Sequence, residues 1–329
     1  MTPVALTMGE PAGIAPEITA MAWSALSGRP DRRFFLIGDA AYQRKRAPAV
    51  PVAEIADASA AASHFARALP VLHRPLAEAP KPGHPLAATA PAVLAAIETA
   101  VDLVLRGEAS ALCTNPIGKT TLYGAGFSFQ GHTDFLADLA RRRGHAAEPV
   151  MMLAAKGLRT VPITVHIALK DVPSQLTASA IVSQARVVAR ELQSRFGIAH
   201  PRLAVTGLNP HAGEAGAMGR EEETIIAPAI ATLRAEGLEV TGPLPADTAF
   251  HDEARATYDA ILCMYHDQAL IPVKTLDFHG GINVSLGLPF VRTSPDHGTA
   301  LGIAGRHIAN PKSLIAAIRL AAVMASAHR

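Results

Sequence analysis

Short apolar runs alternate with longer helical patterns along almost the whole chain of 329 residues. The runs at 3–8, 34–38 and 109–114 have the length and content of buried strands. The longer stretches, such as 86–107 and 181–196, have the period and length of helices. This alternation is typical of βαβ units, and it predicts an α/β fold with mostly parallel sheets.

The composition agrees with helices packed on sheets of that kind. Aromatic residues make up 5% and hydrophobic residues 49% of the chain, so the core has to be built from Ala, Val, Ile and Leu. At roughly 150 residues per domain, the length predicts two domains. A weakly marked boundary falls near Gln130, and the last helix is expected to pack back on the first domain.

Several classes of protein are excluded by charge and hydropathy. The formal net charge is +2 and the basic residues are scattered, so no nucleic acid partner is expected. The N-terminus lacks a basic region, and the apolar stretch 86–105 is interrupted by Pro91, Glu98 and Asp102. Cys113 and Cys263 lie in apolar, strand-like runs and are predicted to be buried thiols. We therefore expect a soluble cytoplasmic protein with no membrane partner.

The common nucleotide-binding and catalytic motifs are absent from the chain. There is no GxGxxG, GxSxG, HExxH or CxxC. The segment 113–120 ends in GKT as a phosphate-binding P-loop does. However, Cys113 stands where that loop needs glycine, and Pro116 removes an amide that would face phosphate. The usual dinucleotide fold and the P-loop are both disfavoured.

Three predicted strands each run into a histidine. The strands are 160–166, 203–208 and 260–265, and the histidines are His166, His211 and His266. Ligands of parallel α/β sheets bind beyond the carboxyl ends of the strands, where three imidazoles could hold a catalytic metal ion. Asp267 and Asp247 are near enough in sequence to orient such ligands. The alternative is that each histidine is an ordinary structural residue at a strand end.

Other residues could bind an anionic substrate. His132 and Thr133 open a predicted helix, where free amides and the helix dipole favour phosphate. Lys274, Asn283 and Arg292 are polar residues between apolar stretches, and arginine offers a two-pronged contact to phosphate or carboxylate. The alternatives are a plain helix cap and solvated surface residues.

Taken together, these segments resemble the 4-hydroxythreonine-4-phosphate dehydrogenase family of vitamin B6 biosynthesis. The segments that carry the resemblance are 9–17 (GEPAGIAPE), 131–136 (GHTDFL), 207–214 (GLNPHAGE), 265–268 (YHDQ) and 278–283 (FHGGIN). In addition, the segment 296–305 (DHGTALGIAG) resembles the adenosine-binding loop of isocitrate and isopropylmalate dehydrogenases. That superfamily binds NAD without GxGxxG, which accounts for the missing motif.

The resemblance implies two α/β/α domains of the isocitrate dehydrogenase-like kind with a cleft between them. We assign 1–130 plus 297–329 to the first domain and 131–296 to the second, which would carry the metal ligands and the interface of a homodimer. The implied metal ligands are His166, His211 and His266, contributed across the dimer to Zn, Mg or Co. The implied substrate-binding residues are His132, Thr133, Lys274, Asn283 and Arg292, and the implied NAD or NADP residues are Gly298, Thr299, Ala300 and Leu301.

The implied reaction is oxidation of 4-phosphooxy-L-threonine to a 2-amino-3-oxo acid phosphate, which then loses carbon dioxide. Lys274 and Asp247 are our candidates for proton transfer. A paralogous dehydrogenase of phosphothreonate or phosphoerythronate is the nearest alternative. A phosphate acyltransferase of related fold and a non-catalytic binding protein are the alternatives from other classes.

Overall fold

The chain folds into two α/β units, and each contributes its own group of neighbouring strands. The computed structural model describes residues 2–124, 126–129 and 131–327. Unit 1 is formed by the chain up to Pro149 together with Leu288–Ala327, and unit 2 by Val150–Gly287. The α/β fold class is confirmed. The predicted division differs, because residues 131–149 and 288–296 belong to unit 1, while the boundary residue Gln130 lies outside the described residues.

The sheet of unit 1 is parallel throughout. Its strands lie in the order β3-β4-β2-β1-β5-β12. Their bounds are β1 (Val4–Thr7), β2 (Phe34–Gly38), β3 (Val52–Ile55), β4 (Leu69–His73), β5 (Leu112–Thr114) and β12 (Arg292–Pro295). β5 and β1 pair so that Thr114 lies beside Thr7, and β12 extends the sheet beside β5. Their carboxyl ends therefore meet at one edge, where ligands of such sheets bind.

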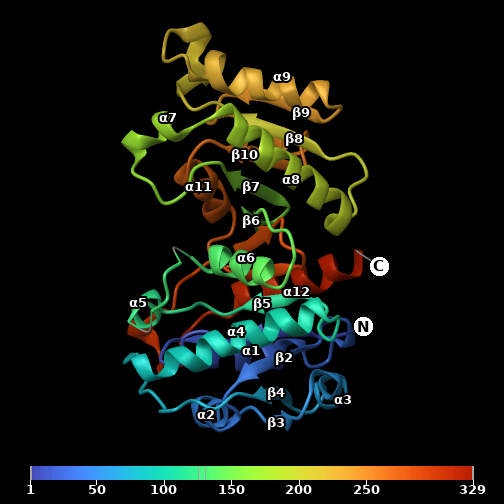
Figure 1. Ribbon diagram of the computed structural model, residues 1–329, viewed down its shortest axis with the longest axis vertical. Helices are drawn as coiled ribbons and strands as arrows, with labels where there is room; N and C mark the ends of the chain where they lie inside the picture. Colours follow the sequence, from blue (N-terminus) through green and yellow to red (C-terminus); the bar gives the residue numbers. More distant parts are fainter. Residues whose placement is uncertain (1, 125, 130, 328–329) are drawn as a thin grey trace. The chain divides into compact units, whose positions relative to one another are not determined.

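Helices from distant parts of the chain cover this sheet (Figure 1). They are α1 (Ala15–Leu26), α2 (Ala40–Arg46), α3 (Ala61–His64), α4 (Ala90–Leu105), α5 (Lys119–Tyr123), α6 (His132–Arg142) and α12 (Lys312–Ala327). α4 packs on β1 and β2 and contacts α6, whereas α12 packs on β12 and contacts α1. The stretch Ala87–Leu105 is long and apolar enough to cross a membrane. However, α4 buries Val93, Ile97 and Val101, so it behaves as a core helix of unit 1.

The sheet of unit 2 is mixed. Its order is β11-β6-β7-β10-β8-β9. The bounds are β6 (Val150–Ala155), β7 (Leu158–Pro162), β8 (Arg202–Thr206), β9 (Glu239–Leu244), β10 (Ala260–Cys263) and β11 (Ile282–Leu286). β6 is antiparallel to both β11 and β7, and the pairs β7-β10, β10-β8 and β8-β9 are parallel. The three strands that precede the candidate histidines, β7, β10 and β8, are thus neighbours.

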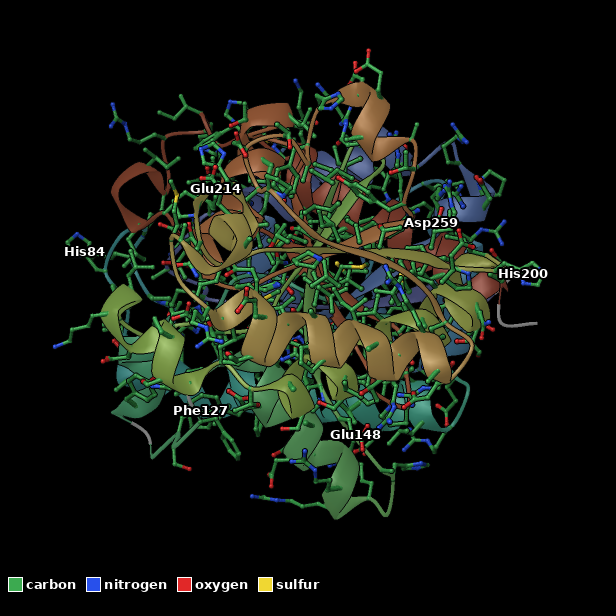
Figure 2. All side chains as sticks on the ribbon, turned by 90° about the horizontal axis from the view of Figure 1, so that it is seen from above. His84, Phe127, Glu148, His200, Glu214 and Asp259 are labelled. Atoms are coloured by element: carbon green, nitrogen blue, oxygen red, sulfur yellow. The ribbon has the colours of Figure 1, made fainter. Side chains whose placement is uncertain are left out.

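The helices of unit 2 pack their apolar faces on this sheet. They are α7 (Val172–Gln175), α8 (Ala178–Phe196), α9 (Ala227–Ala235), α10 (Asp252–Arg255) and α11 (His266–Leu276), with a π-helical turn at Glu222–Ile226 before α9. α11 contributes Ala269 and Val273 to a core that it shares with Leu158, Ile261 and Cys263. Figure 2 labels Glu214, which follows β8 in the chain, and Asp259, which precedes β10.

Most predicted elements are present with shifted ends. The strand predicted at 160–166 ends at Pro162, so His166 lies in the loop that follows it. The elements outside the predicted ones are the strands β3, β9 and β12 and the helices α2, α3, α5, α7, α10 and α11. β9 and β12 both contain proline and polar residues, which weaken a strand pattern. α11 contains Pro272, and a proline inside a helix weakens the helical pattern of the sequence.

Candidate functional site

The histidines predicted to bind metal follow three adjacent parallel strands of unit 2. In the register of these strands, Cys263 of β10 lies beside Pro162 of β7, and Leu262 lies beside Val205 of β8. Parallel neighbours end at the same edge of a sheet, so the loops that carry the three histidines start side by side. This arrangement is consistent with the prediction that the three histidines are delivered to the carboxyl ends of parallel strands.

His166 and His266 come together at this edge. The pairing of β7 and β10 continues past the strands, because the amide of Ile163 donates to the carbonyl of Cys263 over 2.8 Å. The ring centroids of His166 and His266 are 5.6 Å apart. Both residues line a cavity of about 240 Å³ whose other lining residues are Thr164, Ile167, Leu169, Val172, Tyr265 and Asp267. The cavity is large enough for a small ligand to reach both rings.

Asp267 orients one of the two rings. The Nδ1 atom of His266 lies 2.7 Å from Oδ1 of Asp267. A carboxylate at Nδ1 favours the tautomer that carries its proton there, which leaves the lone pair of Nε2 for a ligand. The other histidine, His166, has a backbone φ of 53°, in the left-handed region that few residues other than glycine occupy. Such strained conformations concentrate at functional sites.

His211 lies in a second strained loop at the same edge. It follows β8 in the turn Pro210–Gly216, where the five residues His211 to Ala215 all have positive φ. Its side chain is exposed. Within the residues that the structure describes, no three His, Cys, Asp or Glu side chains converge on one point, so His211 does not complete a ligand set with the other two histidines in this single chain.

The pair of rings nevertheless fits a shared cation. Two imidazoles on one tetrahedral ion, each with a metal–nitrogen distance of ~2.0 Å, have ring centroids ~5 Å apart. The centroids of His166 and His266 are separated by 5.6 Å, close to that value. The donor chemistry fits as well, because imidazole is a preferred ligand of zinc and cobalt. Two of the three predicted ligands thus lie close enough together for one cation, and no third ligand joins them among the described residues of this chain.

Two buried residues that the sequence analysis did not single out hold the histidine loops. Glu222 is 4% exposed, and its Oε1 accepts from the amides of Leu208 and Asn209, each over 2.7 Å. Gln268 accepts from the amide of Met264 over 2.7 Å and donates to the carbonyl of Gly207 over 2.9 Å. The signal for Gln268 was its place directly after Tyr265–Asp267, within a segment that carried the family resemblance.

Unit 1 contains a separate cluster of predicted substrate-binding residues. Arg292 begins β12, is 3% exposed, and donates through Nε and Nη2 to Oγ1 of Thr114 over 3.2 and 2.7 Å. Burial lowers the pKa of its guanidinium to about 10, so it remains charged at neutral pH. Burial, with a smaller contribution from Arg292, holds the pKa of His132 well below its ordinary value.

His132 and Thr133 begin α6 after Gly131. The Nε2 atom of His132 is buried and has no hydrogen-bond partner among the described residues. A neutral imidazole, a buried guanidinium and the amides at a helix N-terminus form an environment that favours a bound anion. Arg292 is close enough to His132 to contribute to the lowering of its pKa, an arrangement that suits a shared anion.

The remaining predicted residues lie on separate elements of unit 2. Lys274 is in the last turn of α11, with Nζ 5.4 Å from the centre of the Phe278 ring. Asn283 is on β11, and its Oδ1 is buried without a hydrogen-bond partner in the described part of the chain. Asp247 lines a cavity of about 350 Å³ beside α11, to which Asp267 also contributes.

The predicted cofactor residues form an exposed loop of unit 1 after β12. Gly298 and Ala300 are exposed, and Thr299 and Leu301 are partly exposed. Ala300 adopts φ 48° and precedes a short 3₁₀ turn at Leu301–Ile303. A loop of this kind presents backbone amides and carbonyls to solvent, as binding to a nucleotide requires.

The sequence matches a known protein family over most of its length. The family described as pyridoxal phosphate biosynthetic protein PdxA matches residues 31–321. A relative from Bradyrhizobium diazoefficiens, named 4-hydroxythreonine-4-phosphate dehydrogenase, is 54% identical over 336 residues, which cover 99% of this chain and 97% of the relative. Similarity of this extent involves both units and every candidate site segment.

Solved structures give the same result. The crystal structure of 4-hydroxythreonine-4-phosphate dehydrogenase from Klebsiella pneumoniae has a TM-score of 0.87 and 37% identity, and the match covers 99% of this chain and 100% of that one. A branched-chain phosphotransacylase from Enterococcus faecalis has a TM-score of 0.55 and 14% identity, covering 97% of this chain and 99% of that one. This second likeness concerns the fold alone.

Proposed function

This chain belongs to the PdxA family of pyridoxal phosphate biosynthetic proteins, and we propose that it oxidises 4-hydroxythreonine 4-phosphate with NAD or NADP at a site that requires a divalent cation. It is a dehydrogenase that performs the oxidation step of pyridoxal phosphate biosynthesis. The observation that supports the cation is the pair of rings of His166 and His266 beyond adjacent parallel strands.

We assign His166, His211 and His266 as the cation ligands. Three imidazoles favour Zn²⁺ or Co²⁺ over Mg²⁺, which prefers oxygen ligands. His166 and His266 would come from one subunit of a homodimer and His211 from the other, because the three do not converge among the described residues of one chain. When bound, the cation would polarise the secondary hydroxyl of the substrate, and the nicotinamide would accept the hydride.

The protein's own side chains would bind the substrate. Arg292 and the amides at the start of α6, with His132 and Thr133, suit one of its anionic groups. Lys274 and Asn283 would bind its other polar groups, and the buried Oδ1 of Asn283 suits a donor such as an amino group or a hydroxyl. Binding at several points would hold the hydroxyl in position for reaction.

A base has to remove the proton of the hydroxyl during the oxidation. Lys274 and Asp247 are the candidates, since both belong to the region around α11 that also carries His266. The product is a 2-amino-3-oxo acid phosphate, in which the new carbonyl lies β to the carboxylate. Loss of carbon dioxide from this acid, with uptake of one proton, gives 3-amino-2-oxopropyl phosphate. We place this reaction in the cytoplasm.

The proposal is tested by following NADH or NADPH formation with three substrates. We expect 4-hydroxythreonine 4-phosphate to be oxidised faster than phosphothreonate or phosphoerythronate, and a chelator to stop the reaction until Zn²⁺ or Co²⁺ is restored. His211→Ala should lose the cation-dependent rate. If phosphothreonate or phosphoerythronate is oxidised faster than 4-hydroxythreonine 4-phosphate, that compound is the substrate and the proposed substrate is wrong. Full activity of His211→Ala in the presence of a chelator would refute the proposed requirement for a divalent cation.

A further inference from the structure

The segment 9–17, which the proposed mechanism does not use, is held by one buried guanidinium. Arg46, the last residue of α2, donates through Nη1 to the carbonyl of Pro11 over 2.7 Å and to the hydroxyl of Tyr42 over 2.9 Å. Through Nη2 it donates to the carbonyl of Gly13 over 3.1 Å and to Oε1 of Glu17 over 2.7 Å. Three of these four acceptors belong to the segment, so a single planar group fixes its shape.

The same segment holds the candidate cofactor loop at both ends. Oε1 of Glu17, which accepts from Arg46, also accepts from the amide of Gly305 over 2.6 Å. At the other end of the loop, the amide of Ile14 donates to the carbonyl of Thr299 over 3.1 Å. Gly13 permits this approach, because a Cβ atom there would lie 2.6 Å from that carbonyl oxygen.

The middle of the loop remains available to a ligand. Gly298, Ala300 and Gly302 are exposed, and the 3₁₀ turn at Leu301–Ile303 has no buried residue. Glu17 and Arg46, by contrast, are inside unit 1, with side chains 1% and 5% exposed. Glu17 of this buried ion pair therefore holds the Gly305 end of the exposed loop directly. The Thr299 end is held by the amide of Ile14, which follows Gly13, a residue whose carbonyl accepts from Arg46.

We propose that Glu17 and Arg46 are positioning residues that hold the loop 299–305 in the shape that binds the adenosine part of NAD or NADP. This inference rests on the proposed function, whose cofactor we place at this loop because the sequence 296–305 resembles an adenosine-binding loop. Glu17 acts through the backbone of Gly305, and Arg46 acts through Glu17 and through the carbonyls of Pro11 and Gly13. Neither side chain needs to touch the cofactor. A loop held before binding loses less conformational entropy when its ligand arrives.

The test uses Glu17→Gln and Arg46→Lys in the full-length enzyme. Glutamine keeps the size of Glu17 but lacks the charge that pairs with Arg46, and lysine cannot reach four acceptors with one ammonium. We expect the Kd of NAD⁺, or of NADP⁺ if it binds more tightly to the wild type, to rise about tenfold in both variants, a loss of ~1.4 kcal/mol. The KM of the phosphorylated substrate and kcat at saturating cofactor should stay within about twofold of the wild type.

Glu191→Gln is the matched control. Glu191 and Arg195 form another buried ion pair of 2.7 Å, with side chains 8% and 9% exposed, but on α8 of unit 2. A general loss of stability would affect all three variants, whereas loop positioning predicts an altered cofactor Kd only in the first two. Amide hydrogen exchange at 299–305 provides a second measurement, since both loop variants should exchange faster there without cofactor while the control should not.

The outcomes separate this inference from the proposed function. A wild-type enzyme that binds neither NAD⁺ nor NADP⁺ overturns the proposed cofactor and this inference with it. Normal cofactor binding by the wild type together with an unchanged Kd in Glu17→Gln and Arg46→Lys overturns the inference alone. An equal rise in the KM of substrate and cofactor would also overturn it, because that result indicates a general disturbance of unit 1.

Discussion

Asp267 illustrates how a single residue can set the chemistry of its neighbour. It is exposed, yet its carboxylate lies 2.7 Å from Nδ1 of His266 and it borders both cavities beside α11. The contact therefore adds little to the stability of the folded protein, because exposed ion pairs contribute little to the free energy of folding. The contact instead decides which nitrogen of His266 is left to bind a ligand.

Replacement of Asp267 with alanine should weaken cation binding. We expect the Kd of Zn²⁺, measured by titration calorimetry or competition with a chelating dye, to rise about tenfold, because outer carboxylates of histidine ligands contribute at least that factor. Glu253→Ala is the control, since Glu253 lies 2.7 Å from Nδ1 of His251, which is not a proposed ligand. An equal Kd in wild type and Asp267→Ala would show that the carboxylate does not orient the ligand.

The two cysteine thiols predict how the stability of the protein depends on pH. Cys113 and Cys263 are buried, and burial raises the pKa of Cys113 from 9.0 to about 12 and raises that of Cys263 as well. As the pH rises, the thiols therefore ionise in the unfolded chain while they are still neutral in the folded chain. Their contribution to stability is complete below pH 9 and decreases as the pH rises toward 12.

We expect neither thiol to react with a disulfide reagent at pH 8 in the native enzyme, and both to react in guanidinium. The guanidinium concentration at the unfolding midpoint should decrease once the pH is raised above the ordinary thiol pKa of 9.0. The variants Cys113→Ala and Cys263→Ala show which thiol is responsible for the labelling and for the change in the unfolding midpoint. Rapid labelling of a native thiol at pH 8 would contradict the burial on which this prediction depends.

At the scale of elements, α8 shows how local sequence sets the ends of a helix. Thr177 caps its first turn by accepting from the amide of Ala180 over 3.2 Å, and Gly197 ends it at φ 70°. The amide of Ile198 then donates back to the carbonyl of Leu192. A glycine in the left-handed conformation, followed by such a bond, is a common end of helices. Both ends of α8 are thus determined by residues next to it in the chain.

Gly197→Ala should destabilise the protein by about 1 kcal/mol, the strain of a left-handed alanine. A Cβ atom at Gly197 would meet nothing within 4 Å, so no steric clash adds to this cost. The measurement is urea denaturation followed by circular dichroism. Gly28→Ala is the matched control, because its Cβ would also meet nothing within 4 Å but its φ is not left-handed. Equal losses in both variants would exclude backbone strain as the cause.

At the scale of the assembly, we propose that the ligand set is shared between two subunits. Within one chain the described residues bring His166 and His266 together, and no third ligand joins them. A homodimer in which the loop of His211 reaches the site of its partner would complete the set. Large exposed apolar residues on unit 2, Leu169, Ile271 and Phe278, agree with burial in such an interface.

Mixed subunits test this arrangement. His211→Ala and His266→Ala should each be inactive as homodimers. After the two variants are mixed, unfolded and refolded together, half of the dimers carry one of each, and one of the two sites in those dimers is intact. We expect about a quarter of the wild-type activity to return. Recovery of none, with dimers confirmed by light scattering, would place all ligands of a site on one chain.

Local sequence is sufficient to predict the features that depend on residues near one another in the chain. The strands before His166, His211 and His266 are apolar and β-branched, and the period of α8 is strongly helical, so their type follows from local preference. The order of the segment GEPAGIAPE and the later motifs along the chain also identified the family. The candidate residues of the site can therefore be named from the sequence alone.

Which of those residues come together depends on long-range contacts. The sequence left Arg292 either a substrate-binding residue or a solvated surface residue, whereas β12 pairs with β5 and buries it against Thr114, 178 residues away. His166 and His266 meet because β7 and β10 are neighbours, an order that no local pattern contains. The roles of Glu17, Glu222 and Gln268 depend on hydrogen bonds to other loops. Local preference acts over a few residues, whereas these contacts join parts of the chain that only folding brings into range.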